Sequence, residues 1–363
     1  MQIGVLGSLS IQTDQMPTKY IDSNIDSYEP IYSPKDLRTT LPASAEVIKN
    51  VVDARTEIQR ILTGESARTI LIVGPCSIHN PPEAIEYAGK LQDLAEKVKD
   101  KFFVLLRTYF EKSRTGLGWK GLIDEPDLDG NSNVSKGLQV ARKLLLDINA
   151  IGMPCATELV DPITPQYILD LVAWSAIGAR SVESRRSREL ASGISTPVGF
   201  KNRTDGNIDV AVEAINYAKE PHAFKGVTED GRIAEIRTRG NKLGHMILRG
   251  GSDKPNYDSI HVARAQDKLR KRGLQDGIII DCSHANSNKD FTRQPTVFLD
   301  VVRQIQAGNT RIVGIMLESY LHEGNQPYAH EGLKKGVSIT DSCISMETTE
   351  RVILEGYGLL TRS

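Results

Sequence analysis

Net charge is nearly absent from this chain of 363 residues, in which 45 Lys and Arg stand against 46 Asp and Glu. Proteins that bind nucleic acid or an anionic membrane surface normally carry a basic excess, so this balance argues against both functions. No apolar run approaches the roughly 18 residues that a membrane-spanning helix needs. We therefore expect neither nucleic acid nor a membrane among its partners.

Cysteine is also scarce. The four cysteines, Cys76, Cys155, Cys282 and Cys343, are scattered and form no C-x-x-C pair. This excludes a dense disulfide framework and favours a reducing compartment. The first basic residue is Lys19, so the N-terminus lacks the basic start of a secretory signal peptide. Together these absences predict a cytoplasmic protein.

The N-terminal part lacks sustained hydrophobic periodicity. Residues 1–42 are polar and contain four prolines, which is typical of a loose tail or of an arm that packs on a partner subunit. A helix is predicted next, with Ser44 as its N-cap and Gly64 as its stop. Its apolar stripe, which has helical spacing, consists of Val47, Ile48, Val51, Val52, Ile58, Ile61 and Leu62.

From residue 69 onward, short β-branched runs alternate with helical stretches, as in parallel βα units. Residues 222–245 are extra material between the fifth and sixth strands and predict a hairpin insertion. The eight predicted strands are 69–73, 102–107, 154–159, 176–180, 197–201, 246–249, 277–281 and 312–317.

Eight parallel strands can close into a barrel or spread as an open, doubly wound sheet. Nearly every predicted strand is followed by a polar side chain, and such strand ends converge on one mouth only in a barrel. We therefore predict a (β/α)₈ TIM barrel at residues 67–363, the catalytic unit. Residues 1–66 are then an N-terminal arm and helix, expected to serve oligomer contacts and regulation. The strand-end residues are Cys76, Arg107, Glu158, Arg180, Lys201, Arg249, His284 and Glu318.

Five side chains expected at the mouth are cations, and crowded cations need an anion to offset their repulsion. Arginine binds phosphate and carboxylate in a bidentate manner, whereas lysine supplies a point charge. The run Lys112-Ser113-Arg114-Thr115 offers a further phosphate site. We infer one or two substrates that carry phosphate and carboxylate. The five cations are Arg107, Lys112, Arg180, Lys201 and Arg249.

A thiolate, an imidazole and two carboxylates are expected near the same mouth. This donor set suits a divalent transition metal, such as Mn²⁺, Fe²⁺, Co²⁺ or Zn²⁺, better than Mg²⁺ or Ca²⁺. The residues form no local metal-binding motif, so spacing alone leaves open that they are ordinary polar side chains of a barrel mouth. They are Cys76, His284, Glu318 and Asp341.

The segments that carry these residues closely resemble the type I 3-deoxy-D-arabino-heptulosonate 7-phosphate (DAHP) synthases. The resemblance spans roughly residues 45–360, in family order, and the first 40 residues are less well covered. The carrying segments include GPCSIHNP (74–81), RTYFEKSRTGLGWKGLIDEPDLD (107–129), PVGFKN (197–202), DCSHANS (281–287), LESYLHEGNQ (317–326) and SITDSCI (338–344).

This resemblance implies a metal-dependent condensation of phosphoenolpyruvate with erythrose 4-phosphate that releases phosphate, the first step of the shikimate pathway. It assigns Arg114 and Thr115 to the aldose phosphate, and the four residues of the donor set to the metal. Lys112, Glu158 and His284 remain the candidates for handling the proton of the attacking water. The residues implied to hold phosphoenolpyruvate are Arg107, Lys112, Ala179, Arg180, Lys201 and Arg249.

The resemblance also implies feedback inhibition by an aromatic amino acid, tyrosine or phenylalanine, and assembly as a homodimer or homotetramer. The effector would bind beside the third and fourth βα units and the hairpin, where glycine at position 226 resembles tyrosine-sensitive relatives more than phenylalanine-sensitive ones. The matching positions are Asp161, Pro165, Gln166, Ser195, Phe224, Gly226 and Ile236.

Two departures from the family pattern concern the aldose. Ser113 stands where proline is usual, and Arg203 stands where glycine is usual. They leave open a related phosphoenolpyruvate-dependent synthase that uses another aldose phosphate, such as arabinose 5-phosphate. A barrel that has become a non-catalytic, amino-acid-sensing subunit is a second alternative. A class II metal aldolase is a third, although it would not need so many cations.

Overall fold

The computed structural model describes residues 22–113, 116–252 and 254–361. The chain divides into two compact units, Met1–Ile31 and Tyr32–Ser363. In the first unit, the described residues 22–31 form no helix or strand. The second unit contains the barrel and both of the cavities discussed below.

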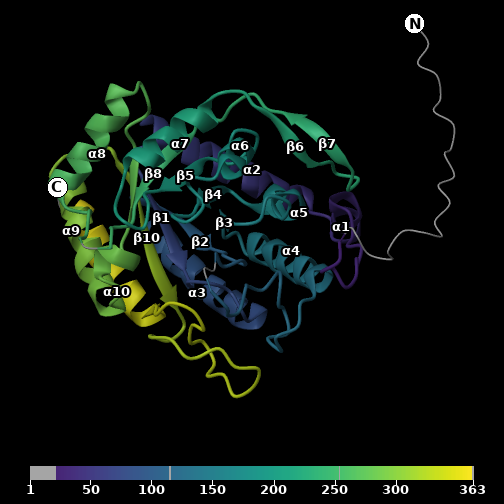
Figure 1. The fold of residues 1–363 in the computed structure, drawn as a ribbon. Coiled ribbons are helices and arrows are strands. Elements are labelled where there is room, and N and C mark those ends of the chain that lie inside the picture. Colours follow the sequence, from purple (N-terminus) through teal and green to yellow (C-terminus); the bar gives the residue numbers. More distant parts are fainter. Residues whose placement is uncertain (1–21, 114–115, 253, 362–363) are drawn as a thin grey trace, which may run out of the picture. The chain divides into compact units, whose positions relative to one another are not determined.

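Eight parallel strands pair in the order β1-β2-β3-β4-β5-β8-β9-β10, and β1 also pairs with β10, so that the sheet closes (Figure 1). This confirms the predicted TIM barrel. A two-residue strand, β11 (Ile344–Ser345), adds to the end of β10. The barrel strands are β1 (Thr69–Gly74), β2 (Phe102–Arg107), β3 (Cys155–Leu159), β4 (Trp174–Ile177), β5 (Val198–Lys201), β8 (Gly244–Leu248), β9 (Ile278–Asp281) and β10 (Ile312–Tyr320).

Helices surround the strands, and their buried apolar faces form one continuous core with the outward-facing strand residues (Figure 1). No helix in the described ranges is both long and apolar enough to span a bilayer. The surrounding helices are α3 (Pro81–Val98), α4 (Val134–Ala150), α5 (Pro165–Ile168), α6 (Arg185–Ala191), α7 (Asp209–Lys219), α8 (Ser259–Lys271), α9 (Gln294–Gln306) and α10 (Met346–Thr361), with short 3₁₀ turns η1 (Leu169–Leu171), η2 (His284–Ser287) and η3 (Phe291–Arg293).

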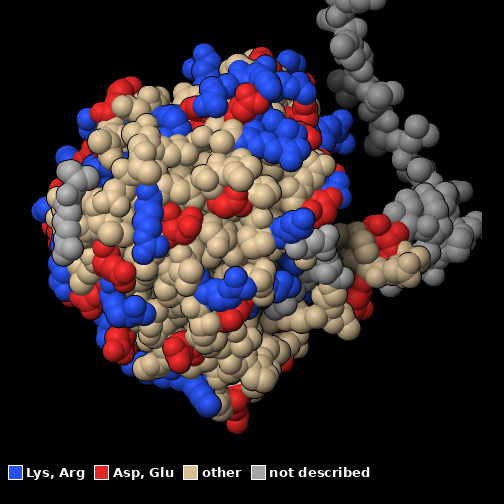
Figure 2. Space-filling view, turned by 90° about the vertical axis from the view of Figure 1, so that its left-hand side faces the viewer, with Lys and Arg blue, Asp and Glu red and all other residues tan. Residues whose placement is uncertain are grey.

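The outer surface carries both signs of charge side by side. On the face shown in Figure 2, basic and acidic side chains are interspersed among neutral ones. Ion pairs form within α8, such as Lys271–Asp267 at 2.7 Å, and between α7 and α8. Lys268 of α8 likewise pairs with Asp209 of α7. Such exposed pairs add little stability, because water and salt screen them.

The predicted helix at residues 45–63 is α2 (Ala45–Thr63). The side chain of Ser44 caps it by accepting from Val47 N, and Gly64 ends it with φ +83°. The predicted apolar stripe is partly wrong, because Ile48 and Val52 are 51% and 52% exposed. Ile58, Ile61 and Leu62 of the stripe share one buried cluster with inward-facing strand residues such as Trp174 and Val313, so the C-terminal half of α2 packs against the barrel interior.

An additional short helix, α1 (Pro34–Thr40), lies in the segment expected to be a tail or arm. Ser33 and Asp36 form a reciprocal capping box, and Pro34 occupies the first helical position. The predicted hairpin is present as β6 (Ala223–Val227) and β7 (Ile233–Arg237), paired antiparallel. The amide of Lys35 donates to the carbonyl of Glu229 at the hairpin tip, so α1 and the insertion contact each other.

Gly137 allows α4 to approach the loop that follows β2. A Cβ atom at this position would lie 1.9 Å from the carbonyl oxygen of Ile123. Backbone cannot yield as a flexible side-chain end can, so only glycine fits here. The close approach supports residues 108–133, which carry Lys112 into the mouth.

We expect Gly137→Ala to lower the free energy of unfolding by about 3 kcal/mol, because the added methyl must displace backbone. Gly89→Ala is the matched control: Gly89 lies within α3, and no described atom beyond its own helix and chain neighbours lies within 4 Å of the place where a Cβ would stand. This substitution should raise stability by up to about 1 kcal/mol. Chemical denaturation measures both. Equal stability of the two variants would contradict this packing argument.

Candidate functional site

A cavity of about 1180 Å³ lies at the carboxyl ends of the barrel strands. Arg114 and Thr115, predicted to bind the aldose phosphate, lie outside the described residues. Cys76 and Glu318 are buried and do not line the cavity wall, although both contact residues that do. The remaining predicted catalytic, substrate-binding and metal-binding residues all line it: Arg107, Lys112, Glu158, Ala179, Arg180, Lys201, Arg249, His284 and Asp341.

Arg107, the last residue of β2, forms a buried ion pair. Its Nη2 donates to Glu318 Oε1 at 2.9 Å, and the two side chains are 2% and 3% exposed. The guanidinium also donates to the carbonyl of Pro75 and lies 3.6 Å from the centre of the Tyr109 ring. A buried charge persists only where it is paired and hydrogen-bonded, so these contacts hold the arginine in one orientation.

Lys201, the last residue of β5, lies between two carboxylates. Its Nζ is 3.5 Å from Glu158 Oε2 and 3.6 Å from Asp281 Oδ2. Burial alone would raise the pKa of Glu158, but Lys201, Arg107 and Lys112 outweigh it and keep that pKa below its ordinary value. Glu158 is therefore ionised at neutral pH.

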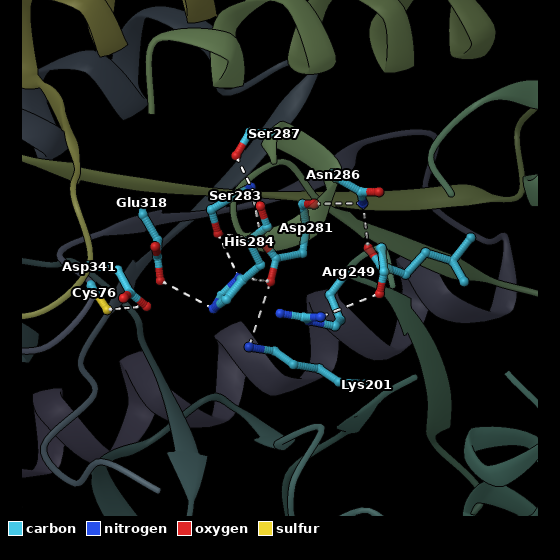
Figure 3. A network of polar contacts seen from close by, with 12 residues as sticks. Cys76, Lys201, Arg249, Asp281, Ser283, His284, Asn286, Ser287, Glu318 and Asp341 are labelled. Carbon is cyan, nitrogen blue, oxygen red and sulfur yellow. Dashed lines mark hydrogen bonds and ion pairs between the residues drawn. The ribbon is translucent and has the colours of Figure 1, made fainter. Parts of the chain in front are cut away.

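Three of the four predicted metal ligands lie together. One ligand atom each from Cys76, Glu318 and Asp341 lies within 4.8 Å of the others. His284 is not part of that group, but its Nε2 lies 3.8 Å from Glu318 Oε1, on the side of the three ligands (Figure 3). Lys112 Nζ donates to Cys76 Sγ at 3.0 Å. A thiol, an imidazole and two carboxylates fit a borderline-soft divalent cation.

Several residues at the mouth were missed from the sequence. Tyr109, Glu111 and Lys289 also line the cavity. The segment 325–328 closes one side of it, and the hydroxyl of Tyr328 donates to the carbonyl of Leu128 in the loop after β2. Tyr109 could have been found by its position two residues beyond Arg107. Lys289 has a left-handed φ of +60°, a backbone conformation that the neighbouring residues do not predict.

The two departures from the family pattern occupy different positions. Ser113 lines the mouth, and its carbonyl accepts from Arg180 Nη1 at 3.0 Å. Arg203 does not line it. Its guanidinium instead pairs with Glu183 at 2.8 Å and with Asp205 at 3.1 Å.

A second cavity of about 390 Å³ lies beside the β6–β7 hairpin. Asp161 lies outside the cavity wall. Its side chain accepts from the amides of Ile163 and Thr164 and so fixes the loop that leads into α5. Pro165 and Ser195 also lie outside the wall. Two cations also line this cavity, Arg186 and Lys225, and they were not predicted from the sequence. The predicted effector residues that do line this cavity are Gln166, Phe224, Gly226 and Ile236.

Glu111 connects the two regions. It lines the mouth, is 8% exposed, and accepts a hydrogen bond of 3.0 Å from the hydroxyl of Thr164, just before α5. Burial, with smaller contributions from Asp161 and Asp124, raises the pKa of Glu111 to about 8. The carboxyl group is thus largely protonated at neutral pH.

A raised carboxyl pKa lowers stability as pH rises, because the unfolded chain releases the proton near pH 4.5 and the folded chain only near pH 8. We expect Glu111→Gln, which cannot ionise, to become progressively more stable than the parent between these values, by up to about 1.4 kcal/mol per pH unit. Urea titrations of both proteins across this range measure the difference. A difference that does not change with pH would contradict the burial argument.

Comparison with known proteins gives a consistent result. Residues 44–353 match the model of the DAHP synthetase I family. The chain is 46% identical over 334 residues to the "Phospho-2-dehydro-3-deoxyheptonate aldolase, Tyr-sensitive" of Escherichia coli (strain K12), covering 92% of this chain and 94% of that protein. It is 49% identical over 333 residues to the Phe-sensitive aldolase of the same organism, covering 92% and 95%.

A solved structure is similar as well. The phospho-2-dehydro-3-deoxyheptonate aldolase from Francisella tularensis SCHU S4 superposes with a TM-score of 0.91 at 43% sequence identity. The match covers 93% of this chain and 99% of that one. The likeness therefore extends over nearly the whole barrel.

Proposed function

Because this chain belongs to the DAHP synthetase I family, we propose that it condenses phosphoenolpyruvate with erythrose 4-phosphate to give DAHP and inorganic phosphate. The observation that carries the proposal is the group of cations around one large cavity, of which Arg107 and Lys201 are buried and paired with carboxylates. Two phosphorylated substrates, one of which is also a carboxylate, need such a concentration of positive charge. A class II aldolase would not.

The deeper cations bind phosphoenolpyruvate in this proposal. Lys201 is the last residue of β5 and Arg249 directly follows the neighbouring strand β8, while Arg107 is the last residue of β2. Their charges hold the phosphate and carboxylate, which places the nucleophilic C3 of the enol against the aldehyde carbon of the second substrate. Carbon–carbon bond formation leaves positive character at C2. Water adds there, and phosphate then leaves.

Glu158 is the group best suited to take the proton from that water. It lines the cavity, and Lys201 and Arg107 keep it ionised. A carboxylate beside the cations that hold phosphoenolpyruvate can accept a proton without leaving its site. Lys112 and His284 are less suited, because both face the thiol and carboxylates of the donor set.

The donor set holds a divalent metal in this proposal, with Cys76, Glu318 and Asp341 as ligands and His284 as the fourth. Bound there, such a cation would polarise the aldehyde oxygen and stabilise the negative charge that develops on it. Mn²⁺, Fe²⁺, Co²⁺ and Zn²⁺ all accept these ligands. Lys112 offsets the negative charge that a thiolate at Cys76 would bring.

The contacts of Arg203 and Ser113 are compatible with erythrose 4-phosphate as the second substrate. Arg203 replaces the usual glycine, but Glu183 and Asp205 neutralise it outside the cavity wall. It therefore adds no free cation to the aldose site. Ser113 keeps its backbone contact with Arg180, which proline could also make, because the contact uses the carbonyl.

We expect metal-loaded protein to release phosphate from phosphoenolpyruvate only when erythrose 4-phosphate is present, with a seven-carbon product by mass spectrometry. Lys201→Met should lower kcat/KM by about 10²-fold or more, because a buried charge in the substrate site is lost. Arg203→Gly, the matched control, should leave kcat/KM within about threefold, since its ion pairs are exposed.

Other outcomes would redirect the assignment. Turnover with arabinose 5-phosphate but not with erythrose 4-phosphate would establish a related synthase with a different aldose. No turnover with any aldose would contradict the catalytic proposal and favour an amino-acid-sensing subunit.

We further propose that the second cavity binds an aromatic amino acid, tyrosine in preference to phenylalanine, as a feedback inhibitor. Similar proteins are named Tyr-sensitive and Phe-sensitive. Phe224 and Ile236 give this cavity apolar walls for the ring, and Arg186 and Lys225 offer cations for the carboxylate. Glu111 and Thr164 connect this region to the mouth.

Gly226→Ala tests the effector site. A Cβ there would meet the tip of Ile236 at 2.3 Å, a flexible end that can move into the cavity and reduce its volume. We expect inhibition by tyrosine to weaken at least tenfold while kcat changes less than twofold, measured by phosphate release against tyrosine concentration. Unchanged inhibition would contradict this assignment.

Assembly as a homodimer or homotetramer belongs to the same proposal, with residues 1–66 contributing contacts as an N-terminal arm and helix and residues 67–363 forming the catalytic barrel. The outer face of α2 supports it, since Ile48 and Val52 lie half exposed one helical turn apart. We place the reaction in the cytoplasm. The four cysteines are free thiols, as a reducing compartment allows.

A further inference from the structure

Asp281 is a buried carboxylate at the end of β9 that neither the metal nor the substrate assignment uses. It is 1% exposed. Its Oδ1 accepts from the amide of Ser283 at 3.0 Å and from the Ser283 hydroxyl at 2.6 Å. Its Oδ2 lies 2.9 Å from His284 Nδ1 and 3.6 Å from Lys201 Nζ (Figure 3). One carboxylate thus contacts both a proposed metal ligand and a proposed substrate cation.

The neighbours of His284 Nδ1 determine which ring nitrogen carries the proton. The hydrogen bond of Nδ1 is with Ser283 Oγ at 2.8 Å, whereas Asp281 Oδ2, 2.9 Å away, is a charged neighbour that accepts no hydrogen bond from the described residues. The serine hydroxyl gives its single proton to Asp281 Oδ1, so towards the ring it can only accept. Nδ1 therefore carries a hydrogen, and in the neutral ring Nε2 keeps its lone pair.

That lone pair is directed towards the donor set. Nε2 lies 3.8 Å from Glu318 Oε1, too far for a hydrogen bond and on the side where Cys76 and Asp341 lie (Figure 3). The backbone is held as well, because the side-chain amide of Asn286 donates to the Asp281 carbonyl at 2.9 Å. A ring so held presents one nitrogen to a metal without rearrangement.

The same carboxylate oxygen restrains Lys201. The ammonium lies between Asp281 on β9 and Glu158 on β3, at nearly equal distances of 3.6 and 3.5 Å. A lysine has a long, flexible side chain, so two opposed carboxylates are what keep its charge at one place in the cavity wall.

We propose that Asp281 is a positioning residue that, through the Ser283 hydroxyl, fixes His284 as the Nδ1–H tautomer, with Nε2 free for the metal, and at the same time holds Lys201 at the phosphoenolpyruvate site. The proposal rests on the proposed function for the identity of the metal site and the substrate. In this proposal a single buried carboxylate aligns both the metal ligand His284 and the substrate cation Lys201.

Asp281→Asn tests it. An amide has one acceptor oxygen and no charge, so the variant must weaken either the Ser283 hydrogen bonds to Oδ1 or the charge contacts of Oδ2 with His284 and Lys201. We expect Co²⁺ affinity, measured by chelator competition, to fall about 10–100-fold. KM for phosphoenolpyruvate should rise at least fivefold, because Lys201 is no longer restrained on that side.

The tautomer is read directly, without any metal. Long-range ¹H–¹⁵N spectra of metal-free protein distinguish a protonated from a bare ring nitrogen, and His284→Gln identifies the signal among the seven histidines. We expect a bare Nε2 in the parent protein and a changed or mixed tautomer in Asp281→Asn. A parent protein with hydrogen on Nε2 and a bare Nδ1 would overturn the proposal before any variant is made.

Asp276→Asn is the matched control. Asp276 lies just before the opposite end of β9, where it pairs with Arg311 at 2.7 Å and with Arg270 at 2.8 Å. Its loss should lower the melting temperature and leave the tautomer and the Co²⁺ affinity unchanged. If Asp281→Asn behaves in the same way, its role is structural only and the proposal is wrong. Failure of the parent protein to form DAHP would refute the proposed function but leave the tautomer result standing.

Discussion

Pairing of buried charge at the carboxyl end of the barrel is the constraint on which the rest of the site depends. Removing a charge from water costs several kcal/mol unless an opposite charge and hydrogen bonds replace the solvent. Here Arg107 of β2 meets Glu318 of β10, and Lys201 of β5 meets Glu158 of β3 and Asp281 of β9. Only a closed sheet brings these strand ends to one place. The fold and the charged mouth therefore require each other.

The barrel and most of its mouth were predictable because two periodic signals coincide in the sequence. Buried parallel strands are continuous apolar runs, and the first polar residue after each run marks the mouth. Asp281 was missed although it ends such a run. The functional residue of this strand end was instead predicted among the side chains that follow, Ser283 and His284. Helix α1 was missed because seven residues are too few to show a helical period, although Ser33, Pro34 and Asp36 form its cap.

Side-chain pairing across the fold was beyond sequence reasoning. Nothing in the sequence shows that Arg203 meets Glu183 rather than an aldose, or that Thr164 donates to Glu111 some fifty positions earlier. The second of these contacts joins the loop after β2, which carries Lys112, to the loop after β3, which borders the second cavity. In the regulation that we propose, a ligand that shifts one loop would act on the other through this buried hydrogen bond.

The positions at which a metal and phosphoenolpyruvate bind are the most direct test of the proposed site. A crystal structure of the Co²⁺-loaded protein with phosphoenolpyruvate, using anomalous scattering, locates both. We expect one anomalous peak coordinated by Cys76 Sγ, His284 Nε2 and the carboxylates of Glu318 and Asp341, with phosphoenolpyruvate on Lys201 and Arg249. A peak elsewhere, or coordination through His284 Nδ1, would contradict the proposed site.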